Sequence, residues 1–211
     1  KSVFDERDIA KILHRYVDDA TLFRQLMARI LQSPAVLRLE RETVEFASGA
    51  RVPSKYTTRE LIRLEAEMAS RAIWLAGRSS HGVRQPVLAA TFARHGNLSQ
   101  GQKTAIEHVA APARIAAVVG RAGAGKTTMM KAAAEAWELA GYRVVGAALA
   151  GKAAEGLEQE AGIVSRTLAS WELRWNEGRD LGDGKTVFGL DEAGMVSARQ
   201  MAFFVETGTK A

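Results

Sequence analysis

The 211-residue chain contains no cysteine, so neither a disulfide framework nor a thiolate metal site is available to it. Its four histidines are never three or four residues apart, which argues against a metal site built on histidine nitrogens. No apolar run approaches the ~18 residues of a membrane span, and no signal peptide opens the chain. These absences predict a cytoplasmic protein without membrane contact. An initiator methionine is also missing, and we expect a piece of a longer polypeptide.

Acidic residues are too few in the first part of the chain to balance its lysines and arginines. The formal net charge is +5. Residues 1–96 contain 16 lysines and arginines against 11 acidic residues, whereas residues 97–211 contain 13 of each. An excess of arginine can indicate a surface for nucleic acid or another polyanion. The alternative is an ordinary solvated helix surface, which charge alone favours.

Residues 1–96 are predicted to form a small, mostly helical domain with one β-hairpin. The helical patterns cover 5–16, a second run to 32 that Asp18 or Asp19 caps, 57–77 and 86–95. Thr57 and Glu60 have the spacing of a capping box at the start of the third helix. Apolar and polar residues alternate from Val36 to Phe46 and Ser48-Gly49-Ala50 turns the chain, which predicts a hairpin ending near Tyr56.

Residues 97–211 alternate strands with helices, and we place a domain boundary before Asn97. The predicted strands are 115–119, 142–149 and 186–190. The predicted helices are 100–109, 126–140, 153–161, 167–175 and 198–206. Such alternation requires right-handed crossovers and gives a parallel sheet covered by helices on both faces. The predicted fold class is therefore α/β, and a short domain of helices precedes the sheet.

The stretch GRAGAGKT at 120–127 matches the phosphate-loop pattern G-x-x-x-x-G-K-[ST] at every fixed position. Glycines let backbone N–H groups converge on an anion, and the following helix adds the positive end of its dipole. Lys126 would reach the β- and γ-phosphates of ATP, and the Thr127 hydroxyl would bind Mg²⁺. The expected nucleotide contacts are Gly120, Ala122, Gly123, Ala124, Gly125, Lys126, Thr127 and Thr128.

Two adjacent carboxylates end the apolar run 187–190. Asp191 would hold Mg²⁺ through water, and Glu192 would orient and deprotonate the attacking water. That division of roles predicts a hydrolase and not a kinase. The alternative is an acidic start of a helix, because carboxylates suit helix N-termini. Gly189 is unexpected, since the interior of a buried strand seldom holds glycine.

Motifs 98–205 together resemble the superfamily one DNA helicases of the RecD-like branch. The similarity is closer still to the helicase region of Ti-type conjugative transfer relaxases, which nick and unwind plasmid DNA. The segments that carry it, in the order of the family, are LSQGQKTAIEHV, VVGRAGAGKTT, ALAGKAAEGL, SRTLASWELRW and LDEAGMVSARQM. The resemblance implies a RecA-like P-loop motor domain over 97–211 that moves on single-stranded DNA, and an accessory domain over 1–96.

The resemblance also assigns roles by position. Gln102 matches the glutamine that reads adenine, although Ser99 and Gln102 also have the spacing of a capping box. Gly151 and Lys152 match a contact to the DNA backbone, for which an ordinary first turn of a helix is the alternative. Thr167 falls in the next DNA-contact motif. The pair Trp171 and Trp175 could stack bases, but its i, i+4 spacing is more typical of a core.

Departures from the family limit what the chain is expected to do. The segment that senses the γ-phosphate and the second motor domain, which supplies arginine fingers, have no counterpart in the sequence. Arginine fingers raise related rates by roughly 10³–10⁵, so we expect weak nucleotide binding, very slow hydrolysis and no unwinding. The expected partners are single-stranded DNA, a second motor domain and a relaxase domain of the same polypeptide, and the conjugation machinery.

Two alternatives to a helicase motor remain open. One is another P-loop ATPase, such as a partition or transport ATPase, which single-stranded DNA would not stimulate. The other is a DNA-docking module with a vestigial phosphate loop. It rests on the arginines of residues 1–96, and it would bind DNA with a steep salt dependence without binding nucleotide.

Overall fold

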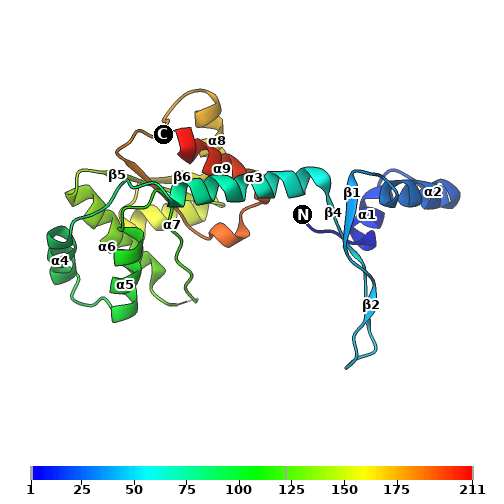
Figure 1. Ribbon diagram of the computed structural model, residues 1–211, viewed down its shortest axis with the longest axis horizontal. Helices are drawn as coiled ribbons and strands as arrows, with labels where there is room; N and C mark the ends of the chain where they lie inside the picture. Colours follow the sequence, from blue (N-terminus) through cyan, green and yellow to red (C-terminus); the bar gives the residue numbers. More distant parts are fainter. Residues whose placement is uncertain (1, 122, 211) are drawn as a thin grey trace. The chain divides into compact units, whose positions relative to one another are not determined.

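The computed structural model describes residues 2–121 and 123–210. Two compact units divide the chain (Figure 1). The first contains residues 1–67 and 197–199, and the second contains residues 68–196 and 200–211. These units are defined by contacts in space and not by a boundary along the sequence. The domain boundary expected before Asn97 therefore stays a prediction. Within the described ranges, no helix is both long enough and apolar enough to cross a membrane.

The first unit combines helices with short antiparallel strands, as expected from its patterns. Its elements are α1 (Glu6–Leu13), α2 (Ala20–Leu31), β1 (Val36–Glu40), β2 (Thr43–Val44), β3 (Arg51–Val52), β4 (Lys55–Thr58) and the first half of α3 (Arg59–Ala76). Asp5 caps α1 by accepting hydrogen bonds from backbone N–H groups of the first turn. These hydrogen bonds, chiefly the one from Asp8 N, hold the pKa of the Asp5 carboxyl below its ordinary value. β1 pairs with β4, and β2 pairs with β3. Ile9 and Tyr56 are the large side chains that this unit buries within its described residues.

The second unit is built around a parallel sheet of three strands. These are β5 (Arg143–Ala148), β6 (Ser165–Thr167) and β7 (Thr186–Leu190), in the order β6-β5-β7. Ala148 is in register with Thr167, and Ala147 with Leu190. The carboxyl ends of the three strands therefore lie at one edge of the sheet, where ligands bind in open α/β sheets.

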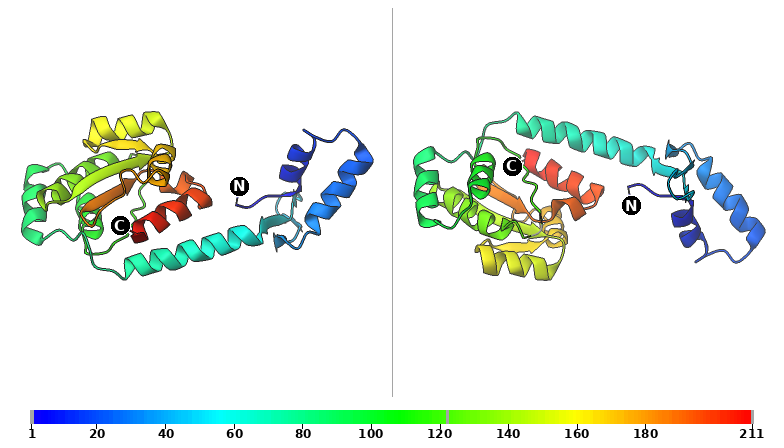
Figure 2. Two further views of the ribbon diagram at one scale, coloured as in Figure 1. Left: turned by 90° about the horizontal axis from the view of Figure 1, so that it is seen from above. Right: turned by 90° about the horizontal axis from the view of Figure 1, so that it is seen from below.

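Helices cover both faces of this sheet, which confirms the predicted fold class (Figure 2). The helices are α6 (Lys126–Leu139), α7 (Gly151–Ala161), α8 (Leu168–Asn176) and α9 (Ala198–Lys210). Val144 of β5 packs with α6 and α7 on one face. The next residue, Val145, packs with α8 and aromatic side chains of α9 on the other. This alternation follows from the period of two in a strand.

A further layer lies outside α6. It consists of α4 (Gln85–Arg94) and α5 (Gln100–Val109), whose Leu88 and Ile106 are buried against Met129 and alanines of α6. Four alanines in α6 allow this close approach on both of its sides, since Ala132, Ala133 and Ala136 face the outer layer and Ala134 faces the sheet. α4, which the sequence analysis assigned to residues 1–96, is thus part of the second compact unit.

The strand predicted at 115–119 is wrong. These residues have no assigned strand, and β7 pairs only with β5 among the strands of the described chain. Val119 is 99% exposed. The apolar run suggested a buried strand, but a strand exists only through hydrogen bonds to a neighbour, and the alanines at 116 and 117 add little β-propensity.

Three smaller predictions also need correction. The α3 cap is Thr58, whose hydroxyl accepts from Leu61 N at 3.2 Å, so the predicted cap at Thr57 is one residue early. Short strand β6 was not predicted, because its three residues, Ser-Arg-Thr, have no apolar pattern. α9 continues to Lys210, past the expected end at Glu206, where a Lys210–Glu206 ion pair of 2.8 Å supports its last turn.

Replacing Gly146 with alanine is expected to destabilise the second unit by about 1–3 kcal/mol. A Cβ at Gly146, in the centre of β5, would collide with Ser165 Oγ and lie 2.7 Å from Leu157 Cδ2. Gly156→Ala in α7 is the matched control, because a Cβ there meets nothing within 4 Å and alanine favours the helix. Urea denaturation should show opposite shifts for the two variants; a neutral Gly146→Ala would contradict the close packing.

Candidate functional site: a phosphate loop at the carboxyl edge of the sheet

The phosphate loop depends on glycine at two positions. Gly123 has φ +74° and Gly125 has φ +69°, in the left-handed region that other residues rarely adopt. Ala124 N donates to Arg121 O at 3.2 Å and closes the turn between them. Gly125 is the N-cap of α6, so the loop runs directly into the first helical N–H groups. The predicted contact at Ala122 lies outside the described residues.

Lys126 and Gln102 both contact the backbone of this loop. Lys126 Nζ donates to Gly120 O at 3.4 Å. Gln102 Nε2 donates to Gly125 O at 3.0 Å, while its Oε1 accepts from Ser99 N at 2.8 Å. The predicted capping box of α5 is therefore formed, and it aims the amide of Gln102 at the phosphate loop. A Cβ at Gly125 would collide with that amide, which is a second reason for glycine there.

Asp191 and Glu192 follow β7 at the carboxyl edge. Asp191 N donates to Ala147 O at 3.0 Å and extends the pairing of β7 with β5. Asp191 Oδ1 accepts from Glu192 N at 2.9 Å. Glu192 has φ +53°, a left-handed conformation that costs a residue with a Cβ about 1–2 kcal/mol. Backbone strain of this kind clusters at functional sites, and the side chain of Glu192 is exposed.

α6 passes directly over β7. A Cβ at Gly189 would lie 3.5 Å from Met130 Cε, four residues after Lys126. Gly189 thus leaves room for the Met130 side chain against the face of the sheet that α6 covers. This contact accounts for the glycine in β7, which the sequence pattern did not explain. The contact brings the start of α6, with Thr127, to the same end of the sheet as Asp191.

The residues expected to contact DNA follow the other two strands. Gly151 and Lys152 open α7 just after β5, and both are exposed. Thr167 ends β6 and caps α8, since its hydroxyl accepts from Ser170 N at 3.2 Å. Because the strands are parallel, these residues share one edge of the sheet with Asp191. The hydrogen bond of Thr167 is a structural role that the sequence analysis did not assign.

A depression of ≈ 290 Å³ lies beside the first turn of α6. Its lining residues are His95, Asn97, Thr127, Thr128, Lys131 and Glu160. A larger one, of ≈ 440 Å³, lies around α2 in the first unit and has no phosphate-binding element. Sequence reasoning missed His95, which donates to Glu135 of α6 and, with Arg94, holds the pKa of that carboxyl below its ordinary value.

Trp171 and Trp175 belong to the core. Their exposed fractions are 3% and 7%, and Trp171 Nε1 donates to Gly146 O at 2.9 Å. Phe188 of β7 meets both rings edge-on, with centroids 4.9 and 5.1 Å away. The structural interpretation of their i, i+4 spacing is confirmed, since buried rings are not available to stack bases.

Comparison with known proteins decides the family. Residues 97–211 match the sequence profile of the AAA domain. The chain belongs to the AAA domain family. The match begins at the residue where charge and pattern change, and it contains the whole carboxyl edge described above.

This AAA domain and the segment before it also have close relatives among conjugation proteins. Over all 211 residues the chain is 78% identical to the "Probable conjugal transfer protein TraA" of Sinorhizobium fredii and 69% identical to the "Conjugal transfer protein TraA" of Agrobacterium fabrum. The expected resemblance to conjugative-transfer proteins is thereby confirmed. The chain spans 19% of the length of each of these relatives.

Proposed function

We propose that the AAA domain binds ATP·Mg²⁺ at residues 120–128 and hydrolyses it to move on single-stranded DNA during conjugative transfer. The observation that carries this proposal is the joint placement of the phosphate loop and the Asp191-Glu192 pair at the carboxyl edge of one parallel sheet. A nucleotide bound there would meet the N–H groups at the start of α6 with its phosphates and would lie near the carboxylate that follows β7. That arrangement suits phosphoryl transfer to water.

The donor set suits Mg²⁺ that is shared between protein and phosphates. In the described part of the chain, no three His, Asp or Glu side chains gather into a metal site of their own. Thr127 and Asp191 would supply the protein's share of the ligands, and phosphate oxygens and water would supply the rest. The metal would neutralise charge on the phosphates, while Lys126 donates to them and Glu192 orients water.

Single-stranded DNA is the proposed track. Lys152 and the first N–H groups of α7 would contact its phosphates, and Thr167 would contact it from the neighbouring strand. Gln102, already beside Gly125, would read adenine. The high identity to proteins named for conjugal transfer supports a role in plasmid transfer, and their greater length supports further motor and relaxase domains in the same polypeptide.

Lys126→Ala is expected to weaken ATP·Mg²⁺ binding by about 10- to 100-fold, the value of a lost charged hydrogen bond to phosphate. Titration calorimetry on the 211-residue chain measures this directly. Lys185→Ala is the matched control, because it removes the same charge from an exposed turn before β7. Equal affinity of the wild type and Lys126→Ala would mean that the loop does not hold phosphate, and the proposal would fail.

A further inference from the structure

The positive charge of residues 1–96 is concentrated in a short segment. Residues 1–67 contain 12 lysines and arginines and 11 acidic residues, so they are almost balanced. Residues 68–96 contain four arginines and no acidic residue. This segment covers the second half of α3, a loop and α4, and it belongs to the same compact unit as the AAA domain. The charge asymmetry of the chain is therefore local to this unit.

Two of the four arginines have carboxylate partners. Arg94 pairs with Glu135, and Arg71 lies 3.6 Å from Glu206 of α9. Among the described residues, Arg78 and Arg84 have no carboxylate at ion-pair distance. A cation without a carboxylate partner is available to a phosphate, because no ion pair has to be broken.

Arg78 lies against Trp74, the most exposed of the four tryptophans. Its guanidinium carbon is 4.5 Å from the centre of the Trp74 ring. Trp74 is 43% exposed, whereas the three other tryptophans are buried or half-buried. The neighbouring Ile73 is 74% exposed. An indole and a guanidinium held together at the surface provide what a nucleotide needs, a stacking face beside a cation.

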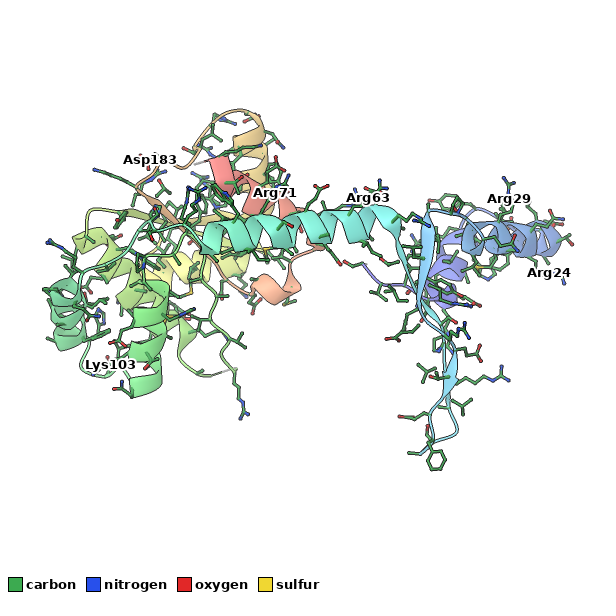
Figure 3. The ribbon with its side chains drawn as sticks, viewed as in Figure 1. Arg24, Arg29, Arg63, Arg71, Lys103 and Asp183 are labelled. Atoms are coloured by element: carbon green, nitrogen blue, oxygen red, sulfur yellow. The ribbon has the colours of Figure 1, made fainter. Side chains whose placement is uncertain are left out.

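Further cations surround this pair. Arg71 and Trp74 are three residues apart and share one face of α3, and Arg78 follows just after the helix ends at Ala76. Arg114 N donates to Arg78 O at 3.1 Å, and Arg114 Nη2 donates to Gly208 O of α9 at 3.2 Å. Figure 3 labels Arg71 where α3 runs along α9.

The carboxylate of Glu206 reaches this surface and is paired. Glu206 pairs with Lys210 as well as with Arg71, and these contacts hold its pKa below the ordinary value. It therefore stays ionised and paired with Arg71 and Lys210, which leaves Arg78 as the cation open to a ligand. A polyanion is favoured over a neutral or acidic protein surface.

We propose that Trp74 and Arg78 form a binding site for single-stranded nucleic acid, with a base stacked on Trp74 and a phosphate on Arg78. The site lies outside the motifs that match the helicase family. It rests on the proposed function only for the choice of DNA as the ligand. It would give the chain a second contact with single-stranded DNA, in addition to the edge of the sheet that carries Lys152 and Thr167.

The test is a titration of a fluorescein-labelled oligothymidylate with the 211-residue chain, without nucleotide, at several salt concentrations. Trp74→Ala is expected to weaken binding by about 5- to 150-fold, as for other stacking residues, with an unchanged salt slope. Trp74→Phe, which keeps a stacking ring, should retain most of the affinity. Arg78→Gln is expected to reduce the salt slope by about 0.7, the value of one contact to a single strand.

Arg63→Gln is the matched control, since it removes the same charge from an exposed position on the same helix (Figure 3). Equal effects of Arg63→Gln and Arg78→Gln, or wild-type affinity in Trp74→Ala, would overturn the proposal. The proposal also fails if the wild type does not bind the oligonucleotide, or if Trp74 mediates self-association in sedimentation runs. Thermal melting verifies that each variant is folded.

The two proposals fail separately. Lys126→Ala should bind the oligonucleotide like the wild type, because the titration contains no nucleotide. Conversely, Trp74→Ala should bind ATP·Mg²⁺ like the wild type. A wild type that binds the oligonucleotide but not ATP·Mg²⁺ therefore counts against the phosphate loop alone. A wild type that binds ATP·Mg²⁺ but not the oligonucleotide counts against the Trp74 surface alone.

Discussion

Replacing Glu192 with glutamine is expected to slow ATP hydrolysis by about 10²–10⁴-fold, the usual value of a general base. Nucleotide binding should be nearly unchanged, because Glu192 is exposed after β7 and would act on the attacking water and not on the phosphates. Glutamine keeps the size of the side chain and can still accept a hydrogen bond, but it cannot take a proton at neutral pH. The expected result is a variant that retains ATP.

Single-turnover hydrolysis with excess protein measures this effect even when the wild type is slow. Glu155→Gln, which neutralises an exposed carboxylate on α7, serves as the control. Calorimetry on the same samples separates the chemical step from binding. If Glu192→Gln hydrolyses ATP at the wild-type rate, another group activates the water and the role given to Glu192 is incorrect.

Trp171→Ala is expected to destabilise the second unit by about 3–5 kcal/mol, as for large aromatic residues removed from a core. Trp171 is 3% exposed and packs against Phe188. The variant would also leave Gly146 O without the hydrogen bond from the indole. Both losses act on the folded state, because the indole is hydrated in the unfolded chain.

Urea denaturation followed by circular dichroism gives the free energy of unfolding. Leu173→Ala is the matched control on α8, since Leu173 is 59% exposed and its truncation should change stability by less than about 0.5 kcal/mol. A Trp171→Ala variant with wild-type stability and impaired DNA binding would contradict the core role and would indicate that Trp171 stacks on bases.

The phosphate loop could be predicted because its information is local. Gly123 and Gly125 need a left-handed backbone, and Lys126 begins the helix that follows, so the spacing alone specifies the turn. Caps such as Asp5 and Ser99 were predicted for the same reason, since their partners are three residues away.

Features that depend on distant partners were missed. The pairing of a strand depends on a neighbour far along the chain, and the run 115–119 looks the same whether or not it has one. His95 and Glu135 are 40 residues apart, so no spacing rule connects them. The positive charge was visible in the sequence, but its confinement beside Trp74 and α9 required the fold.

The left-handed backbone at position 192 has a consequence for sequence variation. Glycine or asparagine would adopt it at a lower cost than glutamate. A library of this domain selected only for heat resistance should therefore drift away from glutamate at this position. A library selected for turnover should keep it. Stability thus favours glycine or asparagine at position 192, whereas activity favours glutamate. A consensus sequence chosen for stability alone would therefore give the wrong residue for catalysis there.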